Sequence, residues 1–400
     1  MYKRAVPVAD LQFGMYVAEL DRPWVETPFA FQGFMLQTER QLQALRKLCR
    51  HVFVDVAVSD VRAMIARPAS PQTSSAAAFE MHGNAGYTAH SELAHEIEAA
   101  GELYSQTVKG LQDFVETLEG GGTALDGSEL HRLVNALADT VIRNPDALLL
   151  VSKLREMDDP AHAKALQVCV YMMVFGRFLQ REPDDIRLLG LLGLLQDVGN
   201  ARLPIMLLLK HSHELTREDA EVLKKHVALS AHIVGITAGL PPRLANLVLL
   251  HHERQDGKGY PRGLRGYQVG LHGSIAAICD AYETHLAPAP YGDAKTPSEA
   301  IKLLLNERGT AFHGPLLEQF VRCMGAFPVG SAVELSSGEY GVVVGEHITQ
   351  RLKPKVLVII DRAHRIVRQR KLVDLAIEPD LRIRRSLDQG QLAFDPRRLL

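Results

Sequence analysis

The sequence predicts a mainly α-helical protein, a multi-helix bundle with a small N-terminal α+β domain and a short C-terminal β extension. Three observations lead to this fold class. Apolar residues recur at three- and four-residue steps from residue 87 to about residue 320, which is the helical period. Runs rich in β-branched residues lie before residue 66 and after residue 328. A length of 400 residues also exceeds what a single small core usually holds.

Residues 1–66 are expected to form the N-terminal domain. Met15–Ala18 and Phe31–Leu36 have the composition of strands, and Glu39–Cys49 has that of a helix. Val52–Val56 would close the sheet. Residues 67–86, which follow, are nearly uncharged and rich in Pro, Ser and Ala, so we expect them to be a linker.

Helices dominate the next part of the chain, with connecting helices expected in residues 87–144 and the main helical domain in residues 145–327. Ile97–Leu118 has a helical period, and a run of three glycines directly after Glu119 ends it. Ser128 has the character of a helix start, and Pro145 begins the next helix.

The last part, residues 328–400, changes character again. Ala332–Leu335, Val342–Val344 and Val356–Ile360 are β-branched runs separated by turn residues, so they predict short strands. The chain from Ile383 onward is polar and is expected to form a tail or latch.

The composition argues against several classes of protein. The chain is 46% hydrophobic and 23% charged, and its formal net charge of -2 gives no basic field for nucleic acid or an anionic membrane. Its 4 cysteines are far apart and fit a reducing cytoplasm rather than a disulfide framework. Polar residues interrupt the most apolar window, residues 188–209, so we expect a core helix there and no membrane span. No signal peptide is expected either, because the N-terminus lacks an apolar run.

The strongest functional pattern is the block HHERQDGKGYP, which runs from His251 to Pro261. Neutral imidazole is the commonest metal ligand in proteins, and Asp280, further along the chain, offers a carboxylate for the same ion. Gly257 and Gly259 permit backbone geometry that a side chain would hinder, and Pro261 stiffens the exit. The block therefore predicts a metal site beside a rigid loop.

With this block, three other segments resemble the HD-GYP family, a branch of the HD phosphohydrolases associated with cyclic-di-GMP hydrolysis in bacteria. LQDVGNARLP at residues 195–204 is similar to the family's LHDIGKxxIP segment, and KKH at residues 224–226 to its later lone histidine. ICDAY at residues 278–282 resembles the segment with the final aspartate. The resemblance covers residues 145–325, and the N-terminal unit is similar to the small domain of unknown function that often precedes HD-GYP. It implies an HD-type helical bundle and a two-metal site for phosphodiester hydrolysis.

The resemblance assigns four residues to one metal ion: Asp197, His226, His251 and His252. In the family the other ion is held by a first histidine, the HD pair and the final aspartate. Here Lys164 stands at the first histidine and Gln196 at the histidine of the HD pair, so Asp197 and Asp280 alone remain. We therefore expect at most one divalent ion per chain (Fe, Mn or Zn), with Asp280 as a weaker ligand.

Lys164 is expected to take over part of the lost metal's role. An ammonium group is a poor metal ligand but a good electrostatic substitute for a cation. Two unpaired carboxylates in a helical core would be costly, so Lys164 should lie near Asp197 and Asp280 and neutralise both. His162 should face another side of the helix and is not counted as a replacement ligand.

The phosphate-binding positions implied by the resemblance are changed as well. Asn200 replaces the lysine of the HD segment, and Ala289 and Gly292 replace the basic residues of an RPYR-like patch. Each charge-assisted bond lost in this way is worth about 1.5–3 kcal/mol. The GYP loop, residues 256–261, keeps the family pattern, which is carried by Asp256, Gly257, Gly259, Tyr260 and Pro261.

Charged residues crowd the same block. Glu253 is expected to be a structural partner of an arginine or lysine rather than a catalytic group. Four basic residues suggest either a solvated face, which we favour for any single residue, or a surface for an anion or a partner: Arg254, Lys258, Arg262 and Arg265.

Two functions follow from these expectations. The favoured one is a degenerate HD-GYP protein with little or no phosphodiesterase activity, which acts by binding cyclic-di-GMP or a signalling partner such as a diguanylate cyclase. The alternative is an active cyclic-di-GMP phosphodiesterase with one metal ion, in which Asp197 is catalytic and Lys164 replaces the second ion.

Overall fold

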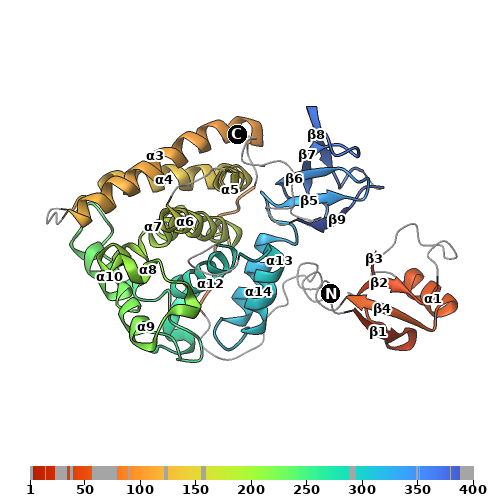
Figure 1. Cartoon of the computed structure of the whole chain (residues 1–400), viewed down its shortest axis with the longest axis horizontal. Coiled ribbons are helices and arrows are strands. Elements are labelled where there is room, and N and C mark those ends of the chain that lie inside the picture. The colour runs from red at the N-terminus through yellow and green to blue at the C-terminus, as the bar shows by residue number, and fades with distance from the viewer. Residues whose placement is uncertain are drawn as a thin grey trace. The chain divides into compact units, whose positions relative to one another are not determined.

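The computed structural model describes residues 3–13, 15–22, 34–36, 39–55, 79–88, 91–120, 125–154, 159–287, 294–347, 350, 352–378 and 380–387. The chain divides into two compact units, residues 1–74 and 75–400. The predicted fold class is confirmed, since a strand-containing N-terminal unit is followed by a helical bundle and a C-terminal antiparallel sheet (Figure 1). Among the described residues, none of the helices has the length and apolar character needed to cross a membrane.

In its described residues the N-terminal unit contains a four-stranded antiparallel sheet, the α-helix α1 (Glu39–Leu48) and a short 3-10 turn at Val8–Asp10. Its strand order is β1-β4-β2-β3, and the strands are β1 (Lys3–Pro7), β2 (Tyr16–Leu20), β3 (Phe34–Met35) and β4 (His51–Asp55). Alternation places Val52 and Val54 in the core, with Leu42 and Leu45 of α1. Strand β1 was not predicted, and residues 31–33 of the strand expected at Phe31–Leu36 lie outside the described residues, as do residues 67–78 of the expected linker.

The second unit is built mainly of helices. Its α-helices are α3 (Leu93–Glu119), α4 (Ser128–Arg143), α5 (Pro145–Leu154), α6 (Pro160–Phe178), α7 (Pro183–Leu195), α8 (Ile205–Leu208), α9 (Arg217–Leu223), α10 (His226–Ile236), α11 (Leu244–Val248), α12 (Gly270–Leu286), α13 (Pro297–Asn306) and α14 (Gly314–Met324). Short 3-10 turns lie at Val198–Arg202, Ser212–Glu214 and Gly266–Val269. Several helices begin with a proline in the first turn, where its missing N–H costs nothing.

Helices α6 and α7 form the centre of the bundle, and both are buried along most of their length. They approach closely where Gly193 meets the backbone of Cys169, because a Cβ on Gly193 would come within 2.7 Å of the Cys169 Cα atom. The prediction of one core helix across residues 188–209 was wrong. Helix α7 ends at Leu195, the chain turns at Asp197, and Met206 beyond the turn is 70% exposed.

A five-stranded antiparallel sheet closes the unit, with strand order β8-β7-β6-β5-β9. Its strands are β5 (Ala332–Leu335), β6 (Tyr340–Gly345), β7 (Lys355–Ile360), β8 (Ile366–Asp374) and β9 (Ile383–Ser386). The sequence predicted β5, β6 and β7. It was wrong to place Ile383–Ser386 in a tail, because Arg384 and Arg385 pair with the buried carboxylate of Glu334 on β5 at 2.7 and 2.6 Å and so hold β9 as an edge strand.

Candidate functional site

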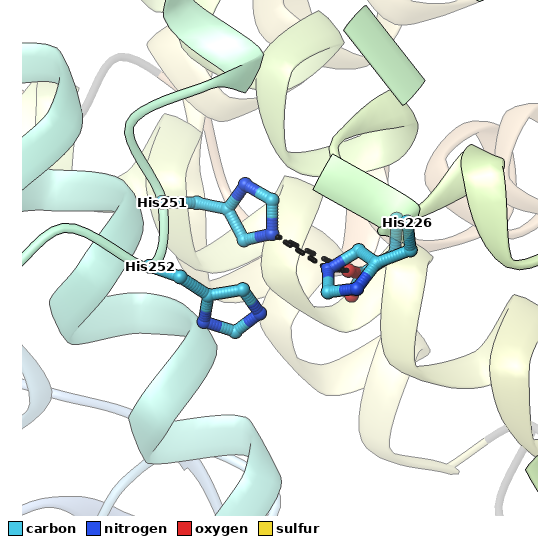
Figure 2. Close-up of side chains that lie close together, drawn as sticks. His226, His251 and His252 are labelled. Carbon is cyan, nitrogen blue, oxygen red and sulfur yellow. Dashed lines mark hydrogen bonds and ion pairs between the residues drawn. The ribbon is translucent and has the colours of Figure 1, made fainter. Parts of the chain in front are cut away.

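Four side chains from separate parts of the bundle converge on one point: Asp197, His226, His251 and His252. Their potential ligand atoms all lie within 4.8 Å of one another. Asp197 follows the end of α7, His226 is the first residue of α10, and the histidine pair follows α11. Figure 2 shows the three imidazoles gathered around a common centre.

Two glycines bring Asp197 to this point. Gly193 allows α7 to lie directly on α6, as described above. Gly199 lets the turn after Asp197 press against the start of α10, where a Cβ would come within 2.3 Å of the His226 carbonyl oxygen. The Gly199 N–H also donates to the Ser230 hydroxyl at 2.7 Å. The glycines of this segment therefore position the carboxylate beside His226.

Backbone carbonyls orient two of the imidazoles. His226 Nδ1 lies 2.7 Å from the Leu223 carbonyl oxygen, and His251 Nδ1 lies 2.7 Å from that of Val248. A carbonyl only accepts, so both Nδ1 atoms carry hydrogen and both Nε2 atoms point their lone pairs inward. This arrangement, in which an outer partner selects the tautomer, is the usual support of a metal-binding histidine.

The inward atoms have the spacing of ligands around a single ion. His226 Nε2 lies 3.2 Å from His251 Nε2 (Figure 2). The two atoms lie 3.2 and 3.5 Å from Asp197 Oδ1. Ligand bonds of about 2.0–2.2 Å around a tetrahedral ion place neighbouring ligand atoms about 3.3–3.6 Å apart. Two inward lone pairs at 3.2 Å also repel unless a proton or a cation lies between them. The donor set therefore fits a divalent metal ion.

The electrostatics of these groups favour a cation at the centre. Burial, together with the neighbouring imidazoles of His251 and His226, holds the pKa of His252 well below its ordinary value, so this ring is neutral at pH 7. Burial also opposes a charge on His226, but its contact with Asp197 raises the pKa above the ordinary value. A proton on His226 would thus compete with a metal ion, and metal affinity should fall as the pH is lowered.

Lys164 lies on the other side of Asp197, where the sequence had led us to expect it. Its Nζ is 3.0 Å from Asp197 Oδ2 and 2.7 Å from Asp280 Oδ1, and its side chain is only 10% exposed. Burial alone would raise the pKa of Asp197, but the Lys164 ammonium and the two imidazoles hold it well below its ordinary value. Asp197 therefore presents one oxygen to the histidines and the other to an ammonium group.

Gln196 and Asp280 complete the side of the site that contains Lys164. Gln196 is 1% exposed, and its Nε2 donates to Asp280 Oδ1 at 3.3 Å. Its Oε1 is buried without a hydrogen-bond partner among the described residues. Asp280, on α12, keeps a longer contact of 3.9 Å from Oδ2 to His252 Nδ1. An ammonium and an amide thus contact Oδ1 of Asp280, and its contact with the histidines is the longer one.

The GYP loop is fastened to the histidine pair by backbone contacts. The Tyr260 N–H donates to the His252 carbonyl oxygen at 3.1 Å, and the Tyr260–Pro261 peptide bond is cis. Gly259 has no room for a side chain, because a Cβ would come within 2.4 Å of that same oxygen. Gly257 has a φ of 78°, and a Cβ there would also meet the side chain of Arg265.

Glu253 holds the far end of this loop. Its carboxylate is fully buried and accepts the backbone N–H groups of Arg262 at 2.7 Å and Leu264 at 2.8 Å. The expectation of an arginine or lysine partner was therefore wrong, because backbone amides satisfy the carboxylate. Its position directly after the histidine pair was the available signal, but a sequence does not show which loop amides will face a buried acid.

Replacing Glu253 by Gln should loosen the loop. The new amide keeps one acceptor oxygen but turns a donor toward the other backbone N–H, which costs about 1.5–3 kcal/mol of stability. We expect lower stability in denaturant unfolding and faster hydrogen exchange at Arg262 and Leu264. Glu218→Gln, at an exposed position in the first turn of α9, is the control and should change neither. Unchanged exchange at both amides in Glu253→Gln would show that the carboxylate does not hold the loop.

Tyr260 forms one wall of the site. Its ring stacks on His252, with centroids 4.7 Å apart and an interplanar angle of 28°, and Lys224 Nζ lies 5.6 Å from the centre of the Tyr260 ring. Burial raises the pKa of the Tyr260 hydroxyl well above its ordinary value. The tyrosine thus stays neutral and fixes the orientation of the His252 ring.

The basic residues of the block serve different purposes. Arg254 donates to the carbonyl oxygens of His251 and Glu253 and lies over the ring of Phe312, so it supports the fold. Lys258 is 85% exposed at the side chain and pairs with Asp256 at 3.6 Å. Asn200 is half-buried in the turn after Asp197, whereas Ala289 and Gly292 lie outside the described residues.

Three family models match consecutive parts of the chain. A domain of unknown function matches residues 3–124, an HD domain residues 152–316, and a KOW domain associated with HD domains residues 332–394. The HD-domain match contains every residue of the metal centre described above.

Known proteins resemble the chain to different extents. A cyclic di-GMP phosphodiesterase of Pseudomonas aeruginosa is 30% identical over 94% of this chain and 89% of its own length. The cyclic di-GMP phosphodiesterase response regulator of Xanthomonas campestris is 30% identical over 48% of this chain and 51% of its own. A solved structure, that of a HDG"Y"P protein from Bdellovibrio bacteriovorus, covers 80% of this chain and 98% of its own with 15% identity and a TM-score of 0.48.

The match to the P. aeruginosa protein runs through all three regions, and the HD-domain match falls on the helices that carry the four converging side chains. This chain belongs to the HD-GYP family, with the N-terminal domain of unknown function and a C-terminal KOW domain.

Proposed function

We propose that this protein is a degenerate member of the HD-GYP family, with one metal ion per chain and little or no phosphodiesterase activity. It would act in bacterial cyclic-di-GMP signalling by binding. The observation that carries the proposal is the Lys164 ammonium, which lies between Asp197 and Asp280 where the family would place a second ion. An ion at that position would have to displace a buried ammonium from two carboxylates.

Two groups of residues would serve the two ion positions that the family carries. The three histidines and Asp197 would hold the ion, which when bound acts as a Lewis acid toward phosphate oxygens and bound water. Lys164 holds Asp197 and Asp280 in place and neutralises them, and Gln196 restrains Asp280. Asn200 offers an uncharged amide in place of a cation, so it would stabilise a phosphate less well.

A binding role has two candidate ligands, cyclic-di-GMP and a signalling protein such as a diguanylate cyclase. The relatives named cyclic di-GMP phosphodiesterases support the nucleotide. The exposed Lys258 and Arg262 at the rigid loop support a partner surface. We place this activity in the cytoplasm, in keeping with the free cysteines.

Metal analysis of the purified full chain tests the site. We expect one Fe, Mn or Zn ion per chain, and loss of that ion in His251→Ala. His232→Ala, which removes an exposed histidine on α10, is the matched control and should keep the ion. Two ions per chain would refute the single-ion site, and none would favour a scaffold without metal.

The proposed lack of activity is tested by incubating the metal-loaded protein with cyclic-di-GMP. Little or no linear product is expected with added Fe, Mn or Zn, whereas binding of the nucleotide should still be measurable by calorimetry if it is the ligand. Robust hydrolysis that disappears in Asp197→Ala would overturn the proposal.

A second function, an active single-metal phosphodiesterase, is favoured by one feature of the same lysine. The ammonium places a positive charge where a second cation would stabilise the phosphate. In that case hydrolysis would be present in the natural protein and would be lost in Lys164→Met, even where this variant is folded and holds its ion.

A further inference from the structure

A large cleft lies between the helical bundle and the C-terminal sheet, away from the metal centre. Its volume is about 900 Å³, which falls within the range of about 300–1,000 Å³ of small-molecule sites. Its walls come from α3, α5, the end of α6, α14 and strands β6, β7 and β8. All of these belong to one compact unit, and α5 contacts β6 directly.

Most of the cleft wall is apolar. Leu150, Val174 and Phe178 line it on the bundle side, and Leu357 and Leu372 line it on the sheet side. Leu372 is 57% exposed, so an apolar side chain at this wall remains in contact with water. A ligand that buries these surfaces must have an apolar body.

One corner of the cleft holds a buried positive charge. Arg177 is 9% exposed; its Nε donates to the Ile142 carbonyl oxygen at 3.0 Å, and its Nη2 donates to that of Thr88 at 3.1 Å. These carbonyls accept hydrogen bonds but carry no full negative charge. Within the part of the chain that the structure describes, Arg177 forms no ion pair with a carboxylate. The carboxylate of Asp146 attracts the Arg177 guanidinium from a longer distance, but burial still disfavours its charge and lowers its pKa. An anionic ligand within hydrogen-bonding distance would offset that cost.

A second polar group in this corner lacks a partner. The hydroxyl oxygen of Tyr87 is buried and has no hydrogen-bond partner among the described residues. Its ring lies under the Arg177 guanidinium, 5.6 Å from centroid to Cζ, and its backbone N–H is held by Gln180 Oε1 at 2.7 Å. Buried hydroxyls normally have a partner, so this corner lacks an acceptor.

Two of the acidic residues that line the cleft have other contacts. Asp146 Oδ2 accepts the backbone N–H of Glu346 at 3.3 Å, which joins β6 to α5. The Glu346 carboxylate occupies the space beside Gly325, at the end of α14, where a Cβ would clash with it. These two acids connect the sheet to the bundle, and Lys355 adds a second cation to the sheet wall.

We propose that this cleft binds an amphipathic anion, a molecule with an acyl-like apolar body and one carboxylate. The carboxylate would accept hydrogen bonds from the Arg177 guanidinium and the Tyr87 hydroxyl, and the chain would lie along Val174, Leu357 and Leu372. Helix α6 carries both Arg177 and Lys164, so the new site and the metal centre lie about 20 Å apart along one helix at about 1.5 Å per residue.

Binding is measured with the full chain and a fluorescent dansyl-labelled fatty acid, in competition with dodecanoate. We expect saturable binding that dodecanoate displaces at least about tenfold better than dodecanol, since only the carboxylate can pair with Arg177. Arg177→Gln should remove this preference in a protein that keeps its helical circular dichroism.

A second variant tests the cleft at an exposed position, away from the buried Arg177. Leu372→Trp fills the cleft from its exposed side and should weaken fatty-acid binding by about tenfold or more. Ile377→Trp, at a 76% exposed position after β8 that does not line the cleft, should bind as the natural protein does. The proposal fails if Leu372→Trp binds the labelled fatty acid normally, or if dodecanol competes as well as dodecanoate. Chelators should leave binding unchanged, which separates this site from the metal centre.

Discussion

Replacing Lys164 by Met should destabilise the protein by about 3–5 kcal/mol, the range expected when one partner of a buried ion pair is removed. Lys164 Nζ contacts two carboxylates at 3.0 and 2.7 Å, and the side chain of Asp280 is only 4% exposed. Methionine keeps most of the volume but leaves two negative charges beside each other. Unfolding in denaturant, monitored by circular dichroism, measures the change in stability.

The loss of stability in Lys164→Met should depend on pH. Because the pKa of Asp197 is depressed in the folded protein, its interactions stabilise the fold above the unfolded pKa of about 3.9 and lose this effect as the pH falls through the folded value. In Lys164→Met the Asp197 carboxylate no longer faces an ammonium, so this source of stability is absent from the variant. The difference in stability between the two proteins should therefore be largest at neutral pH and shrink below about pH 4.

Two controls isolate the role of the ammonium. Lys210→Met removes a lysine that pairs with Asp219 at 2.7 Å near the surface, and this variant should change stability little. Added Mn²⁺ should raise the melting temperature of Lys164→Met more than that of the natural protein, because a cation can then take the vacated position. A Lys164→Met variant as stable as the natural protein would show that the ammonium does not compensate the two carboxylates.

The fold was predictable from the sequence because each class of element has its own local pattern. The helical period, the prolines at helix starts and the β-branched runs marked the bundle and three strands of the C-terminal sheet. Strand β9 was missed since its stability depends on a distant partner, the buried Glu334, which pairs with Arg384 and Arg385. The apolar residues of α8 were wrongly assigned to the core, also because their position depends on distant neighbours. The turn after α7 packs against α10, and the chain beyond it leaves Ile205 and Met206 exposed.

The sequence predicted which residues form the site and one of its contacts, but not the groups that orient them. Residue types and family spacing pointed to the converging ligands and to Lys164 near its two carboxylates. Three features escaped prediction because they depend on backbone atoms or on neighbours remote in sequence. These are the carbonyls that orient His226 and His251, the amides that satisfy Glu253, and the stack of Tyr260 on His252.

Lys164→His combined with Gln196→His should restore a second metal ion. The two substitutions return imidazoles to the positions where the family carries histidines, beside Asp197 and Asp280, and remove the ammonium that occupies this side. We expect metal analysis to rise from one ion to two per chain. A second cation contributes several kcal/mol to phosphoryl chemistry, so hydrolysis of cyclic-di-GMP should rise by on the order of 10²-fold.

The two single variants show whether the missing histidine at 164 or the one at 196 does more to prevent binding of a second ion. Gln196→His alone should not bind a second ion, because Lys164 still occupies both carboxylates, whereas Lys164→His alone should bind it weakly through fewer ligands. Adding Asp280→Asn to the double variant should remove the second ion again. A folded double variant that still holds one ion would refute the role given to Lys164 and Gln196. One that holds two ions without hydrolysis would move the cause of inactivity to the phosphate contacts, and Asn200→Lys would then be the change that restores turnover.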